Sequence, residues 1–251
     1  MSQAQSIWVD FRLLRDNCHF RAIFIARLMS VLGLGMLTVA VPVQIHALTG
    51  STLQVGIATA LDGLGMFIGL LVGGVLADRY DRRWLIVLAR GLCGLGFLLL
   101  ALNSFIAQPS LLALYLVAFW DGFFGALGMT ALMAAIPSLV GRDNLATAGA
   151  LSMLIVRLGA VLAPTISGLV IISLGVSWNY LFAGLGTLCT LIPLLSLPSL
   201  QPHASTSAER PWQALLEGGR FLLQHPIVGA VVVLGTVQAL LSAIRVLFPA
   251  L

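Results

Sequence analysis

Charged residues are scarce in this chain, and lysine is absent from it. Only 9% of its 251 residues are charged, whereas a soluble domain carries roughly 25%. So few charges would not cover a large core with a polar surface. Intrinsic disorder is excluded too, because 59% of the residues are hydrophobic and disordered segments need low hydrophobicity with high charge. The composition therefore predicts a polytopic membrane protein.

Cysteine is also scarce. Cys18, Cys93 and Cys189 are odd in number and far apart, which argues against a disulfide framework or a metal cluster. The 13 basic residues, all arginine, are scattered between apolar runs and do not form the clustered face that nucleic acid requires. The polar N-terminus lacks the apolar core of a cleaved signal peptide. We therefore expect no metal, no cofactor and no nucleic-acid partner.

Long apolar runs dominate what remains. A helix needs about 20 residues to cross the hydrocarbon core, and continuous runs predict helices rather than the alternating strands of a barrel. A last run begins near Ile227 and is still apolar at Leu251. The complete runs predict membrane-spanning helices over residues 20–45, 53–76, 84–105, 111–136, 145–174 and 178–197.

The placement of arginine predicts the orientation of these helices. The tail, residues 1–19, and every second connection carry arginine, whereas the connections between them carry no charge. By the positive-inside rule, the N-terminus is cytoplasmic. The bundle then covers residues 20–197, a cytoplasmic linker covers 198–225, and a second bundle begins within 226–251. In the linker, Pro211 opens an amphipathic segment that predicts a helix on the inner membrane surface.

Some charged side chains lie inside the predicted spans, where each costs about 2.5–3.5 kcal/mol on insertion scales. Asp62, Asp121 and Arg157 fall near the middles of their spans. We expect them to line an aqueous path that binds substrate or carries protons, together with Trp120. The alternative is an internal ion pair, such as Asp121 with Arg157, that stabilises the bundle.

Arg27 and Arg245 lie nearer to the ends of their spans. Each either faces the same path or extends its long side chain to the membrane surface. If both face the path, their guanidinium groups suit an anionic or catechol-bearing ligand, because guanidinium pairs with oxyanions and stacks on rings.

Glycines at positions 65, 69 and 73 form a ladder of small residues in the second predicted helix. Such ladders let two membrane helices approach closely. We therefore expect this helix to pack tightly against a neighbour.

The second connection carries a recognisable motif. It contains Gly74, Asp78, Asp81, Arg82 and Arg83, and it resembles the signature between helices two and three of the major facilitator superfamily. That signature has a second glycine where this chain has Asp81. The resemblance implies a gate at the cytoplasmic ends of these helices. The alternative is that these charges only anchor the connection on the cytoplasmic side.

The fifth span carries a second such motif, with Gly159, Pro164 and Gly168. It resembles the antiporter motif of the same superfamily, with Ala163 and Ser167 in place of two glycines. The resemblance implies a fold of twelve helices in two six-helix halves. The chain would then be all-α and would comprise the N-terminal half and part of helix seven.

Longer runs, among them those around Gly74 and Asp121, resemble enterobacterial exporters of the catecholate siderophore enterobactin. The resemblance implies an inner-membrane secondary transporter, driven by the proton gradient, whose partners are a small-molecule substrate, the bilayer and the missing C-terminal half. A multidrug or antibiotic efflux antiporter of the same superfamily is the alternative. An intramembrane enzyme or a channel is more distant, because the sequence has neither a HExxH or GxSxG motif nor a repeated pore element.

Overall fold

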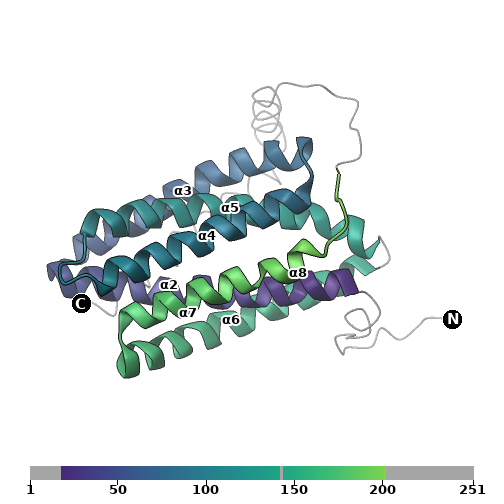
Figure 1. The fold of residues 1–251 in the computed structure, drawn as a ribbon. Coiled ribbons are helices and arrows are strands. Elements are labelled where there is room, and N and C mark those ends of the chain that lie inside the picture. The colour runs from purple at the N-terminus through teal and green to yellow at the C-terminus, as the bar shows by residue number, and fades with distance from the viewer. Residues whose placement is uncertain (1–17, 142–143, 202–251) are drawn as a thin grey trace, which may run out of the picture. The chain divides into compact units, whose positions relative to one another are not determined.

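The structure is a computed structural model that describes residues 18–141 and 144–201 (Figure 1). Three expectations fall outside these residues: the N-terminal tail, the amphipathic helix after Pro211, and the seventh span with Arg245. The described part is a bundle of long helices, as the apolar runs predict.

The helices follow one another with short connections. Within residues 18–141 and 144–201, six segments are long and apolar enough to cross a membrane, and the last of them (Val176–Leu195) is built from two shorter helices. The six predicted spans and the all-α fold are therefore confirmed. The helices are α2 (Cys18–Thr49), α3 (Thr52–Arg79), α4 (Arg82–Phe105), α5 (Leu111–Val140), α6 (Leu145–Leu174), α7 (Val176–Cys189) and α8 (Leu191–Leu195).

Consecutive spans run in opposite directions, with α8 continuing the direction of α7, so the connections between spans alternate between the two ends of the bundle (Figure 1). We call the end at which α3 joins α4 the basic end, because Arg79, Arg82 and Arg83 lie there. The turn between α6 and α7 lies at the opposite end. Gly175 closes α6 there with a φ of +96°, a conformation that favours glycine.

The predicted glycine ladder brings α3 into backbone contact with α5. A Cβ atom on Gly65 would lie 2.2 Å from the carbonyl oxygen of Phe119. A Cβ atom on Gly69 would lie 2.2 Å from the carbonyl oxygen of Phe123. Gly73, one turn further along, is equally close to α5. At Gly65 and Gly69 the obstructing atoms are backbone atoms, so a side chain there would force α3 and α5 apart, whereas the nearest atom to Gly73 belongs to the Thr130 side chain.

Helix α2 is held against α6 and α7 by small residues and by hydrogen bonds. A Cβ atom on Gly35 would lie 2.4 Å from the Cβ atom of Ala163 in α6. The carbonyl oxygen of Met36 accepts hydrogen bonds from Ser167 Oγ at 3.1 Å and from Asn179 Nδ2 at 3.2 Å. Because these donors are buried, the bonds fix the middle of α2 to two neighbouring helices.

The last span is divided at Thr190, where the sequence predicts an unbroken run. Pro193 has no N–H to donate to the carbonyl of Cys189, and its ring crowds that carbonyl. The Thr190 hydroxyl instead donates to the Thr187 carbonyl at 2.6 Å. The chain therefore ends α7 at Cys189 and begins α8 at Leu191.

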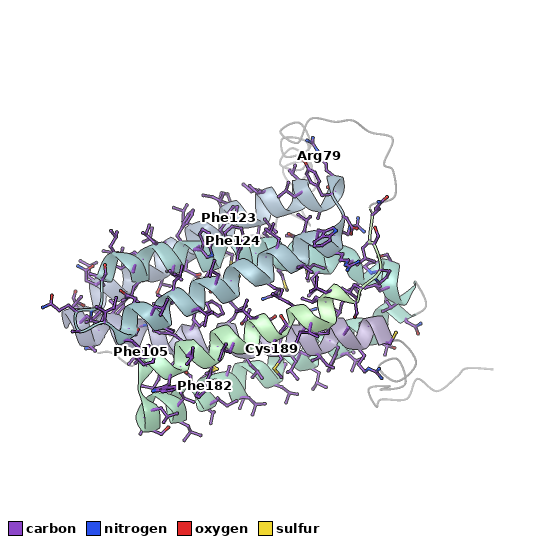
Figure 2. All side chains as sticks on the ribbon, viewed as in Figure 1. Arg79, Phe105, Phe123, Phe124, Phe182 and Cys189 are labelled. Atoms are coloured by element: carbon purple, nitrogen blue, oxygen red, sulfur yellow. The ribbon has the colours of Figure 1, made fainter. Side chains whose placement is uncertain are left out.

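Apolar side chains cover much of the outside of the bundle (Figure 2). Ile172 is 87% exposed, Ile192 74% and Leu53 71%. A water-soluble protein rarely exposes so much contiguous apolar surface. This surface is suited to lipid tails and to other membrane helices.

Candidate functional site

Two arginines are buried inside the bundle near the basic end. Arg27 of α2 is 7% exposed and Arg90 of α4 is 6% exposed. The expected alternative for Arg27, a side chain that reaches the membrane surface, is not what the structure shows. The sequence analysis missed Arg90. Its signal was available, because it is an arginine well inside the third span, as Arg27 is inside the first.

The two predicted acidic residues lie side by side. A Cβ atom on Gly122 of α5 would lie 2.1 Å from the carbonyl oxygen of Asp62 on α3, so the two helices are in contact at this level. The carboxyl groups of Asp62 and Asp121 interact electrostatically. The Oδ1 atom of Asp121 is buried and has no hydrogen-bond partner among the described residues. Acidic residues inside membrane spans are rare and mark substrate, ion or proton pathways in transporters.

The other neighbours of Asp121 come from α4. Among the described residues, the groups that interact electrostatically with it are Asp62, Arg90 and the thiol of Cys93. Arg157 is not one of them and lies exposed on α6. The alternative ion pair between Asp121 and Arg157 is therefore not formed. The structure instead brings Asp121 next to Arg90.

Trp120 lies at the edge of this cluster and is 36% exposed. Its Nε1 atom donates a hydrogen bond to the carbonyl of Leu92 at 2.8 Å, which ties α5 to α4. Its ring centroid lies 4.7 Å from that of Phe124, one turn further along α5. These contacts fix the orientation of the indole and leave about a third of the residue exposed.

Two arginines of the first motif bind backbone carbonyls at the basic end. Arg82 donates from Nε to the carbonyl of Ala77 at 3.2 Å and from Nη1 to the carbonyl of Ala134 at 2.9 Å. Arg83 donates from Nη2 to the carbonyl of Leu195. These bonds connect the α3–α4 turn to α5 and α8, so the motif fastens three parts of the bundle together.

The remaining motif residues divide between packed and open positions. Gly159 is packed, since a Cβ atom there would lie 2.1 Å from a side chain of α2. Gly74 and Gly168 are open, with no atom within 4 Å of such a Cβ. Asp78 and Pro164 are exposed. At the open glycines, no described residue packs within 4 Å of the position that a side chain would take.

Asp81, which stands where the superfamily motif has glycine, makes contacts that the sequence analysis did not anticipate. Its Oδ1 atom accepts hydrogen bonds from the backbone N–H groups of Arg83 at 3.0 Å and Leu200 at 2.9 Å. Its Oδ2 atom accepts one from Ser199 Oγ at 2.6 Å. The Arg82 N–H also donates to the Leu200 carbonyl at 3.3 Å. Asp81 therefore caps α4 and binds the segment that follows α8.

These contacts explain the ionisation of Asp81. Partial burial alone would raise its pKa, but the hydrogen bonds from Ser199, Leu200 and Arg83, with the charge of Arg83, lower the pKa below its ordinary value. The carboxylate is therefore the form that holds the segment after α8.

Metal ligands do not converge in the described part of the chain. Within residues 18–141 and 144–201, no three His, Cys, Asp or Glu side chains come close enough to share an ion. The candidate site consists of arginine, aspartate and aromatic side chains.

Comparisons with known proteins support the family that the motifs indicate. Residues 23–251 match the sequence profile of the Major Facilitator Superfamily. The chain is 55% identical over 247 residues to the enterobactin exporter EntS of Shigella boydii serotype 18 and to that of Escherichia coli O1:K1. The match covers 98% of this chain and 59% of each relative. The chain therefore spans less than two thirds of the length of these relatives.

Solved structures agree on the fold. A peptide transporter of the POT family bound to alafosfalin aligns with a TM-score of 0.63 at 20% identity, over 92% of this chain and 49% of that one. A POT family transporter bound to 5-aminolevulinic acid aligns with a TM-score of 0.59 at 16% identity, over 91% and 47% of the two chains. With six apolar helices in its described part, matching motifs and a profile match over most of its length, the chain belongs to the Major Facilitator Superfamily.

Proposed function

We propose that the protein exports enterobactin, or a closely similar catecholate siderophore, across the bacterial inner membrane. The observation that carries this proposal is the 55% identity to enterobactin exporters, which extends over 98% of the chain. The solved transporters are too distant to indicate a substrate, since they share 20% identity or less.

The mechanism that we propose is alternating access, with substrate bound between two halves near the middle of the membrane. Asp62 and Asp121 carry protons in exchange for substrate. Arg27, Arg157 and Trp120 line the substrate path. The proton gradient drives export, and no bound cofactor or catalytic step is required.

The bonds at the basic end support a gating role for the first motif. Arg82 and Arg83 join the α3–α4 turn to α5 and α8. Movement of one of these elements therefore pulls on the others. Asp78, which is exposed, is available to a partner from the second half of the transporter. Such a contact closes the basic end while the opposite end is open.

The location and orientation that we propose follow from arginine placement. The basic end faces the cytoplasm, and the turns after α2, α4 and α6 face the periplasm. The N-terminus is then cytoplasmic, and export proceeds from the basic end to the opposite end.

Export is tested in enterobacterial cells that lack their own enterobactin exporter. The gene for the full-length protein is expressed under iron limitation, and intact enterobactin in the medium is measured by mass spectrometry. We expect secretion to rise several-fold above the empty vector. A variant with Asp62→Asn and Asp121→Asn, matched for amount in the membrane, should not restore it.

Two results would contradict the proposal. One is secretion equal to that of the empty vector although the protein is present in the membrane. The other is increased resistance to unrelated antibiotics without any change in secreted enterobactin, which would favour a drug pump.

A further inference from the structure

A strap of residues after α8 is bound to the α3–α4 turn. We use the name strap for residues 197–201. Asp81 of the turn accepts hydrogen bonds from Ser199 Oγ at 2.6 Å and from the Leu200 N–H group at 2.9 Å. The Arg82 N–H group, at the start of α4, donates to the Leu200 carbonyl at 3.3 Å. Three hydrogen bonds therefore join the strap to the turn.

Apolar packing holds the strap on the bundle. Leu197 is 1% exposed and Leu200 is 6% exposed. Both side chains belong to a buried cluster that also contains Ile23 of α2 and Ile86 of α4. Because close packing in such a cluster resists displacement, the leucines fix the strap to the bundle, and the hydrogen bonds then fix the turn to the strap.

The carboxylate of Asp81 is shared between the strap and the first turn of α4. Its Oδ1 atom accepts from the N–H groups of Leu200 and Arg83, and its Oδ2 atom accepts from Ser199 Oγ. Arg83 also donates from Nη2 to the carbonyl of Leu195, the last residue of α8. A side chain that binds both the turn and the strap limits the movement of one relative to the other.

The backbone does not require glycine at position 81. Asp81 has a φ of −59° and a ψ of 115°, a conformation that residues with side chains adopt without strain. The superfamily motif has glycine here, and glycine offers no side-chain acceptor to Ser199 or to Leu200. The strap contacts of Asp81 are therefore additional to the motif, and they act on the turn that carries it.

We propose that Asp81 is a positioning residue for the gate, because it fastens the α3–α4 turn to the strap in the arrangement that closes the basic end. This inference rests on the proposed alternating access, in which the turn takes part in closing that end. A turn that is already ordered loses less conformational entropy when it meets the second half of the transporter. Without the strap contacts, only a fraction of turns is ready for closure, and the closing step slows by that fraction. Substrate binding, which uses other residues, is unchanged.

Amide hydrogen exchange tests whether the strap orders the turn. The full-length transporter is placed in lipid nanodiscs, and exchange in residues 79–84 is followed by mass spectrometry. Ser199→Ala removes one strap bond without changing the turn itself, and it should speed exchange in the turn about two- to tenfold. Ser196→Ala is the matched control, because the Ser196 hydroxyl donates to the Pro193 carbonyl of α8 at 2.7 Å. It should leave exchange in the turn unchanged.

Transport kinetics separate positioning of the gate from stability of the fold. Uptake of enterobactin into inside-out membrane vesicles is measured over a range of concentrations and divided by the amount of transporter. Asp81→Ala should lower the maximum rate about three- to tenfold, the factor expected for one net hydrogen bond, and leave the half-saturating concentration unchanged. Asp81→Asn keeps one acceptor oxygen and should recover part of the rate.

Ser199→Ala should lower the maximum rate less than Asp81→Ala does. When the two changes are combined, Ser199→Ala should add nothing further, because both changes break the same bond. Ser196→Ala should keep the full rate.

The results separate the role of Asp81 from the export function. If Asp81→Ala and Ser199→Ala take up enterobactin at the maximum rate of the unmodified protein, the inference is overturned and the export function stands. Unchanged exchange of the turn in Ser199→Ala, or equal effects of Ser199→Ala and Ser196→Ala, would also overturn it. If the vesicles take up ethidium but not enterobactin, the siderophore is wrong, and the same rates measured with ethidium decide the inference. If Asp81→Ala fails to fold, the rates of Ser199→Ala and Ser196→Ala decide it.

Discussion

Replacing Gly69 with alanine should loosen the bundle at the contact between α3 and α5. The added Cβ atom would lie 2.2 Å from the carbonyl oxygen of Phe123 and 2.9 Å from its carbonyl carbon and Cα. Non-bonded carbon atoms normally rest about 3.5–4.0 Å apart. The obstructing atoms belong to the backbone, so no side-chain rotation relieves the clash. The helices must therefore separate by about 1 Å.

The expected cost is that of overpacking a well-packed interior, about 1–3 kcal/mol. For a chain of this size, each kcal/mol shifts the midpoint of thermal unfolding by about 2–4 °C. Gly69→Ala should therefore lower the midpoint by roughly 2–12 °C in detergent or nanodiscs, measured as the temperature at which the size-exclusion peak is lost.

Gly56 provides the matched control on the same helix. No atom of the described residues packs within 4 Å of a Cβ atom built there. Gly56→Ala should leave the midpoint unchanged or raise it slightly, because alanine is the better helix former by about 0.5–1 kcal/mol. Equal midpoints for Gly69→Ala and Gly56→Ala would refute the reasoning that α3 and α5 depend on backbone contact.

Three further predictions concern ionisation, coupling and orientation. Asp81→Asn should destabilise the protein by up to about 1 kcal/mol at neutral pH, since the site is partly exposed. Folding lowers the pKa of Asp81, so its stabilising contribution is present above the unfolded pKa of about 3.9 and is lost as pH falls through the folded pKa. The thermal unfolding midpoints of the unmodified protein and of Asp81→Asn should therefore converge below about pH 4. A difference between the two midpoints that does not change with pH would argue against this origin of the stability. Asp62→Asn and Asp121→Asn should each reduce enterobactin export about tenfold or more and remove the sensitivity of export to an uncoupler. Full-rate, uncoupler-sensitive export by the double variant would exclude proton transfer by these acids. A reporter active only in the periplasm should be active when fused at Gly50 and inactive at Gln201, and the reverse result would invert the proposed orientation.

The sequence determined the number of spans and the family for a simple physical reason. A helix in lipid must satisfy its own backbone hydrogen bonds and present apolar side chains over about 20 residues, and both demands leave a local pattern that can be read along the chain. The ladder of Gly65, Gly69 and Gly73 is local in the same way. It predicted a close helix contact, which the structure confirmed with α5 as the partner.

The partners of the charged residues depended on the tertiary structure. Arg27 of α2 and Arg90 of α4 are far apart in sequence, and the tertiary structure buries both of them inside the bundle. Asp121 lies beside Arg90 rather than Arg157, since α4 packs against α5 with Arg90 facing it. Asp81 accepts a hydrogen bond from the backbone of Leu200, 119 residues further along the chain. Hydropathy fixes which segments enter the membrane, but it carries no information about which helix faces which. That choice depends on close packing between segments that are distant in the sequence.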